Sequence, residues 1–186
     1  MKIQRKKSNI LLTAEKNKIL IAYEEDVLFE TNPEIVVSKI NSPKLDTKLS
    51  SFVISTCGEY EEKGIMVQAL PTVGSNSIDI ISIDCEGMNI VIADSNTSLL
   101  NKKNLEQIGI NNILLFNDID GVGKIFEIID ELAPQFIVVI GSDVTVELIN
   151  KKLSLNIPEK QKIFSISRQD LPNEEDGNPI QLVLLD

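Results

Sequence analysis

Residues 57–83 read CGEYEEKGIMVQALPTVGSNSIDIISI, and this stretch decides the fold that we predict. We interpret residues 58–61 as a turn that leads into a strand at 65–70. A Pro-Thr break at 71–72 then delivers the chain to a second strand at 77–84. This order is typical of the approach to a metal-binding loop, yet the 186-residue sequence contains no histidine.

Short apolar and β-branched segments continue on both sides of this stretch. The predicted strands there are 9–13 and 18–22, which form a hairpin, and 34–38, 51–55 and 88–93. After residue 93, apolar residues recur at helical spacing between buried strands. The predicted order is a helix in TSLLNKKNLEQI before Gly109, strand NNILLF, helix GKIFEIIDEL before Pro134, strand QFIVVI, helix DVTVELINKKL capped by Ser142 or Asp143, and closing strands KIFSIS and IQLVLL.

Strands dominate the first half of the chain, and strand–helix units dominate the second. This pattern predicts an α/β fold with two β-sheets and helices packed outside them. A length of 186 residues suits one domain over 1–186 with a sizeable core. Because aromatic residues make up 4% of the chain and Trp is absent, Ile, Leu and Val must form that core.

Charge and composition exclude several classes of protein. The net charge of −10 argues against a nucleic-acid partner, since neutralising phosphates needs a basic surface. We interpret the one basic cluster, within residues 2–7, as a solvated terminus rather than a docking patch. No apolar run is long enough for a membrane span, and no signal peptide is expected. With two cysteines and no Cys-x-x-Cys pair, we expect reduced thiols in a cytoplasmic protein.

Six segments together carry a family resemblance. They are MKI with KSNILL, PEIVVSKINSPKLD, FVISTCGEYEEKGIMVQALPT, MNIVIAD, APQFIVVIGSD, and KIFSISRQDLP with QLVLLD. In this order they resemble the metallo-β-lactamase fold family, in its branch of compact metal-dependent hydrolases, nearly from end to end. The resemblance implies a four-layer αββα sandwich of two mixed β-sheets with helices outside.

The same resemblance locates the positions of the family's metal ligands. The family hallmark after a strand is Ser-His-x-His-x-Asp-His, because two zinc ions need closely spaced imidazoles and a carboxylate. The matching residues here begin at Ser38 and contain no histidine. The former metal-site positions are Lys39, Asn41 and Lys44 for three histidines, Pro43 for the aspartate, Gly74 and Gly141 for later histidines, and Asp94 for the metal-bridging aspartate. Among these, only Asp94 retains a ligand residue type, so we expect no zinc.

We therefore predict a non-catalytic member of the fold, a pseudoenzyme without cofactor. Such a protein serves as a binding or structural subunit that contacts a protein partner or another copy of itself. The alternative is a hydrolase that uses Mg, Mn or Ca at a carboxylate site of Asp94, Asp118 and Asp143. We also predict that Lys39 and Lys44 approach Asp94 and Asp143, with ion pairs where metal once balanced the charge.

Other candidate motifs favour structural interpretations. Residues 118–124 lack the closing Glu of a calcium loop and the spacing of a phosphate-binding loop, so a loop before a helix is expected. Cys57 and Cys85 have no histidine to generate a thiolate. A Ser38–Lys39 dyad is disfavoured because adjacent strand residues point to opposite faces. We interpret the Gly-Glu-Tyr motif at 58–60 as a turn with a partly buried tyrosine.

Overall fold

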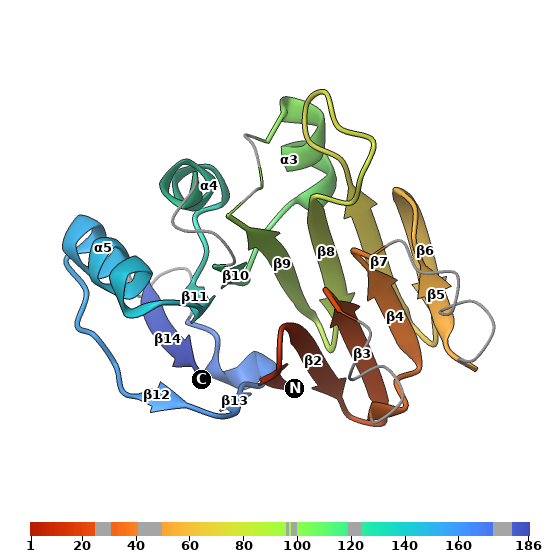
Figure 1. The fold of residues 1–186 in the computed structure, drawn as a ribbon, viewed down its shortest axis with the longest axis horizontal. Coiled ribbons are helices and arrows are strands. Elements are labelled where there is room, and N and C mark those ends of the chain that lie inside the picture. Colours follow the sequence, from red (N-terminus) through yellow and green to blue (C-terminus); the bar gives the residue numbers. More distant parts are fainter. Residues whose placement is uncertain (25–30, 41–49, 96, 98–99, 119–123, 173–179) are drawn as a thin grey trace.

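Two β-sheets pack face to face (Figure 1). A computed structural model of the chain describes residues 1–24, 31–40, 50–95, 97, 100–118, 124–172 and 180–186. The first sheet has six strands in the order β13-β1-β2-β3-β4-β5. Its members are β1 (Lys2–Lys6), β2 (Asn9–Ala14), β3 (Asn17–Ala22), β4 (Ile35–Ser38), β5 (Phe52–Ile54) and β13 (Phe164–Ser165). It is mixed, because β3, β4 and β5 run parallel while β1, β2, β3 and β13 pair antiparallel.

The second sheet has eight strands in the order β12-β14-β11-β10-β9-β8-β7-β6. Its members are β6 (Gly58–Glu62), β7 (Ile65–Leu70), β8 (Ile80–Cys85), β9 (Met88–Asp94), β10 (Ile113–Asn117), β11 (Phe136–Ile140), β12 (Lys160–Gln161) and β14 (Gln181–Leu185). Neighbouring strands among β6, β7, β8 and β9 pair antiparallel, and neighbouring strands among β9, β10, β11, β14 and β12 pair parallel. The carboxyl ends of β9, β10 and β11 therefore meet at one edge, where ligand sites of such sheets form.

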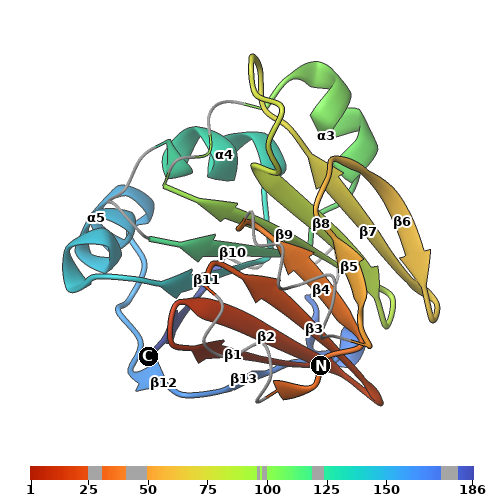
Figure 2. The ribbon, with the colours of Figure 1, turned by 45° about the vertical axis from the view of Figure 1, so that its right-hand side comes forward.

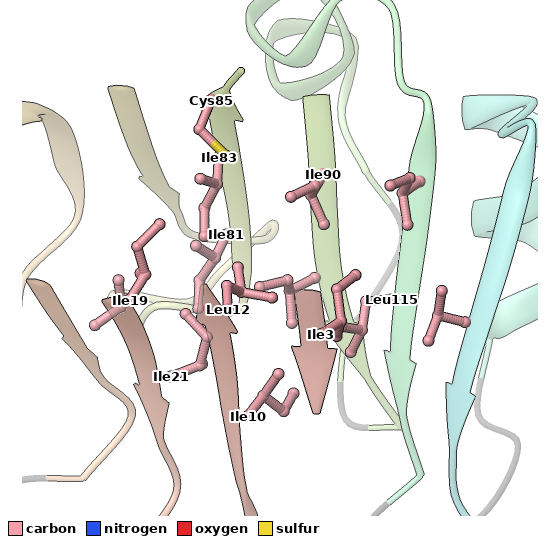
Figure 3. Close-up of a cluster of buried hydrophobic side chains, with 14 of the residues drawn as sticks. Ile3, Ile10, Leu12, Ile19, Ile21, Ile81, Ile83, Cys85, Ile90 and Leu115 are labelled. Carbon is pink, nitrogen blue, oxygen red and sulfur yellow. The ribbon is translucent and has the colours of Figure 1, made fainter. Parts of the chain in front are cut away.

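The core between the sheets is aliphatic, as the composition predicts. Ile3, Ile10, Leu12, Ile19 and Ile21 of the first sheet face Ile81, Ile83, Ile90 and Leu115 of the second (Figure 3). Each of these nine side chains is fully buried. Alternate residues of β2 and β3 point outward, and the outer face of the first sheet buries Leu11, Leu20, Ala22 and Val36. Both faces of these strands are apolar, which explains why their sequences read as continuous hydrophobic runs.

Three helices lie along the outer face of the eight-stranded sheet within the described ranges (Figure 2). They are α3 (Lys102–Ile108), α4 (Ile125–Leu132) and α5 (Asp143–Leu153). The predicted apolar stripe of α4 is confirmed, since Ile125, Ile128, Ile129 and Leu132 are all buried. Gly109 ends α3 at φ +66°, and Ser142 caps α5, as predicted. The predicted sandwich of two mixed sheets with helices outside is confirmed.

Several predicted boundaries differ from the structure. Residues 58–62 form the edge strand β6 and not a turn, because alternate residues point inward, with Tyr60 half-buried and Glu59 and Glu61 in solvent. The Tyr60 ring meets Phe52 of the other sheet edge-on, with 6.1 Å between centroids. The strand predicted at 77–84 begins at Ile80, and the basic segment at 2–6 is a paired strand.

Two further sequence predictions agree with the structure only in part or lie mostly outside the described residues. The loop expected at 118–124 lies mostly outside the described residues, which resume at Lys124, the residue before α4. The closing strand KIFSIS contains the two-residue β13, while β12 precedes it in the other sheet. None of the helices in the described part of the chain is long and apolar enough to cross a membrane.

Candidate functional site

The predicted site residues that the structure describes lie at strand ends. Lys39 directly follows β4 of the first sheet, and its backbone N–H donates to the Ala22 carbonyl at 2.9 Å. Asp94 is the last residue of β9 and lies beside Asn117, the last residue of β10. Since the two sheets face each other, residues after β4 and β9 can meet across the end of the sandwich. Asn41, Pro43 and Lys44 lie outside the described residues.

Lys39 and Asp94 form an ion pair across the two sheets. The Lys39 Nζ donates to Asp94 Oδ2, and it also donates to the Asp79 carbonyl at 3.2 Å. The lysine side chain is 10% exposed and the aspartate side chain 8% exposed. An unpaired charge is costly in such a buried position, so the contact between the two opposite charges offsets part of the cost of burying them. The predicted approach of Lys39 to Asp94 is confirmed.

Thr97 and Asp79 hold the Asp94 side of the pair. The Asp94 N–H donates to Thr97 Oγ1 at 3.0 Å, and the Thr97 N–H donates back to the Asp94 carbonyl at 2.9 Å. The Thr97 hydroxyl lies 3.3 Å from the Asp79 carbonyl and 3.4 Å from Asp94 Oδ1. These hydrogen bonds of Thr97 hold the Asp94 carboxylate where Lys39 reaches it.

The Asp79 carboxylate is anchored separately by Thr72. Asp79 Oδ2 accepts from the Thr72 N–H at 2.8 Å and from the Thr72 hydroxyl at 2.7 Å. Burial alone raises the pKa of Asp79, but Thr72, Ser75 and Lys39 outweigh it, and the net pKa is lowered. The resulting stabilisation is complete above the ordinary Asp pKa of about 3.9 and is lost as pH falls through the lowered value.

The Tyr23 ring also contacts the Lys39 ammonium. Lys39 Nζ lies 5.4 Å from the centroid of the Tyr23 ring, within the range of a cation–π contact. The Tyr23 hydroxyl is buried, and no hydrogen bond to it is formed by the described residues. The nearby Asn117 side chain acts to lower the pKa of Tyr23. Burial, followed by the charge of Asp94, raises the pKa of Tyr23 well above its ordinary value. The surroundings of Tyr23 therefore disfavour the phenolate, the form that would act as a base.

Gly141, the position predicted to correspond to the late histidine of the family, has no room for a side chain. A Cβ added there would come closer to the Asp118 Cβ than real Cβ contacts allow, and would lie 3.0 Å from Asp118 Oδ2. Asp118 is held in place by α5, because its Oδ2 accepts from the Ser142 hydroxyl at 3.0 Å and from the Thr145 hydroxyl. The Asp118 side chain thus fills the space that a ligand from position 141 would use.

The remaining candidate positions do not join Lys39 and Asp94. Gly74 lies in an exposed turn at φ +81°, with nothing within 4 Å of an added Cβ. Asp143 is largely exposed and pairs with Lys160 at 2.7 Å, whereas Lys39 pairs with Asp94, so the predicted pairing of Asp143 with Lys39 is wrong. Its predicted approach to Lys44 lies outside the described residues. Over the described ranges, no group of three or more His, Cys, Asp and Glu side chains is placed to hold a metal ion.

The surroundings of both thiols disfavour the thiolate form. Burial, followed by the charge of Asp79, raises the pKa of Cys57. Burial, followed by Glu86 and Asp84, raises the pKa of Cys85 to about 12. Both cysteines are unbridged, and neither favours the thiolate needed for nucleophilic attack.

Sequence reasoning missed Tyr23, Asp79 and Thr97 as members of the site. Thr72 lies in the Pro-Thr break that the sequence does single out, but its role in anchoring Asp79 is visible only in the fold. Tyr23 directly follows β3, and this position at a strand end is the one sequence feature that indicates its place near Lys39.

Comparisons with known proteins identify the fold. Neither a protein-family model nor a curated protein sequence matches the chain. A Thermotoga maritima protein of the metallo-β-lactamase superfamily, considered a Zn-dependent hydrolase, superposes with a TM-score of 0.69 at 18% identity, over 100% of this chain and 98% of that one. The metallo-β-lactamase fold protein YhfI from Bacillus subtilis gives 0.54 at 8% identity, over 96% and 88%. The CmlA β-hydroxylase gives 0.56 at 12% identity, over 81% of this chain and 51% of its own. The chain has the metallo-β-lactamase fold.

Proposed function

We propose that this protein is a non-catalytic version of the metallo-β-lactamase fold that acts as a binding or structural subunit. One observation carries the proposal: the Asp94 carboxylate is paired with the Lys39 ammonium. A lysine ammonium has no lone pair to offer a metal ion and repels a divalent cation. The retained aspartate is thus committed to a cation that belongs to the chain itself.

The residues at the strand ends do not fit a zinc centre. A zinc site needs about four ligands from Cys, His and carboxylate groups. This chain has no histidine, and Asp118 fills the space beside position 141. Without that ligand set, the described residues offer no metal site that could lower the pKa of a bound water or polarise a carbonyl.

The alternative of a hydrolase with a carboxylate site has less support. Its three candidate carboxylates are engaged with different partners: Asp94 with Lys39, Asp118 with the first turn of α5, and Asp143 with Lys160. A hard cation such as Mg²⁺ or Ca²⁺ needs several oxygen ligands that converge on one point. A fold shared with hydrolases does not by itself supply that convergence.

A protein partner suits this proposal better than a substrate. The net charge of −10 disfavours nucleic acid, so the simplest partner is a protein or a second copy of the chain. Sedimentation over a wide range of protein concentration separates these two cases, since self-association alone makes the apparent mass rise with concentration.

The proposal predicts that the purified protein hydrolyses neither β-lactams, carboxylic esters nor phosphodiesters. We expect no turnover above buffer when Zn²⁺, Mg²⁺, Mn²⁺ or Ca²⁺ is added, because no described cluster can hold any of them. The matched control is Asp94→Ala, checked for folding by circular dichroism and assayed beside the wild type. If the wild type turns over a substrate and Asp94→Ala does not, the protein is the carboxylate-site hydrolase instead.

A further inference from the structure

The Lys39 ammonium contacts groups from both sheets, although its own backbone belongs to one of them. Its acceptors are the Asp94 carboxylate and the Asp79 carbonyl, which come from the eight-stranded sheet and the loop that leads into it. The ammonium also lies 5.4 Å from the ring centroid of Tyr23, which follows β3 of the six-stranded sheet. One side chain therefore joins the ends of β3, β4, β8 and β9.

These contacts are complementary to a primary ammonium ion. An ammonium group has three N–H donors and no acceptor. A carboxylate oxygen, a carbonyl oxygen and an aromatic face are all electron-rich, and each attracts a cation. The groups around Lys39 Nζ thus suit a cation, which the chain itself supplies.

The charge, more than the carbon chain, accounts for this arrangement. Asp94 is 8% exposed, and removing the ammonium would take away the counter-charge that lies next to its buried carboxylate in the described part of the chain. Removing one partner of a buried ion pair is strongly destabilising, whereas replacing both partners by apolar residues is often harmless. We therefore expect a single substitution in the pair to lower the stability strongly, and an apolar double substitution to lower it less.

We propose that Lys39 is an internal ionic tether between the two sheets, and that the position of its ammonium is a binding site for a primary alkylammonium ion once the lysine is shortened. The tether would be required whether or not the protein has a catalytic activity, so this inference stands apart from the proposed function.

Chemical rescue of Lys39→Ala tests the tether. The substitution removes the equivalent of one n-propylammonium ion, and we expect the melting temperature to fall by about 6 to 20 °C. n-Propylammonium chloride should then raise it again in a saturable way, by about 3 to 6 °C at a tenfold excess over the dissociation constant. The same salt should leave the wild type unchanged relative to sodium chloride at equal ionic strength.

Two controls separate charge from solvent effects. 1-Propanol has nearly the same size without the charge, so it should not rescue Lys39→Ala. Lys102→Ala removes a lysine whose side chain is 90% exposed in its pair with Glu106, and it should neither lower the melting temperature nor respond to the ammonium. Equal rescue by 1-propanol, or no fall in melting temperature for Lys39→Ala, would overturn the tether.

A second pair of variants keeps the test decisive if Lys39→Ala does not fold. Lys39→Met retains most of the carbon chain without the charge, and it should be less stable than the double variant Lys39→Met/Asp94→Leu, in which neither charge remains. A double variant less stable than Lys39→Met contradicts the proposal. Failure of the proposed function would appear elsewhere, as hydrolysis by the wild-type protein.

Discussion

Replacing Val138 with aspartate is expected to leave the protein without a stable folded state. Val138 lies in the middle of β11, between Leu115 of β10 and Val183 of β14, and it is fully buried in the core between the sheets. The substitution loses about 1.5 to 3 kcal/mol of apolar burial and adds a charge with no partner. A cost above about 4 kcal/mol approaches the total stability of many domains, which is about 5 to 15 kcal/mol.

Urea unfolding followed by circular dichroism measures this effect. The matched control is Val144→Asp, because Val144 is 64% exposed in the first turn of α5, where an added carboxylate favours the helix dipole. That variant, and Glu59→Gln on the edge strand β6, should change the free energy of unfolding by no more than about 0.5 kcal/mol. A cooperative, wild-type-like unfolding transition for Val138→Asp would show that Val138 does not belong to the core between the sheets.

Substituting Gly141 with alanine is expected to destabilise the protein by about 1 to 3 kcal/mol, although the change adds one methyl group. The added Cβ collides with Asp118, whose backbone N–H donates to the Ile140 carbonyl at 2.8 Å and whose carboxylate accepts from Ser142 and Thr145. Asp118 cannot move aside without disturbing the start of α5. The expected fall in melting temperature is about 2 to 12 °C.

The double variant Asp118→Gly/Gly141→Ala checks the cause. Asp118→Gly alone should also be destabilising, because it removes the acceptor for two hydroxyls at the start of α5. Without the Asp118 side chain the collision is gone, so Gly141→Ala should cost much less in that background. Equal costs in both backgrounds would mean that Asp118 does not close position 141.

The sequence predicts the sandwich well because its elements are carried by local patterns. Runs such as FIVVI in β11 and the stripe from Ile125 to Leu132 in α4 become buried as predicted. Strand β6 is missed because three of its five residues are glutamates, and only its inward-facing Tyr60 belongs to the pattern of a buried strand. At a sheet edge with one solvated face, polar composition does not distinguish a strand from a turn.

The site is less predictable, because it depends on how loops from different strands meet. The pairing of Lys39 with Asp94 follows from two strand ends, and it is confirmed. The contacts of Tyr23, Thr97 and the Asp79 carbonyl are set by loop conformations that no local pattern encodes. The position of Asp143 after β11 predicts a place in the same cluster, but Asp143 pairs with Lys160, which follows α5.

The zinc content of the wild-type protein, purified and dialysed without chelator, tests most directly whether a chain-borne cation has replaced the metal. The account predicts well under one zinc per chain by elemental analysis and an unchanged melting temperature in EDTA, because the ion pair of Lys39 and Asp94 needs no metal. One zinc per chain that survives dialysis and is lost in Asp94→Ala would contradict it.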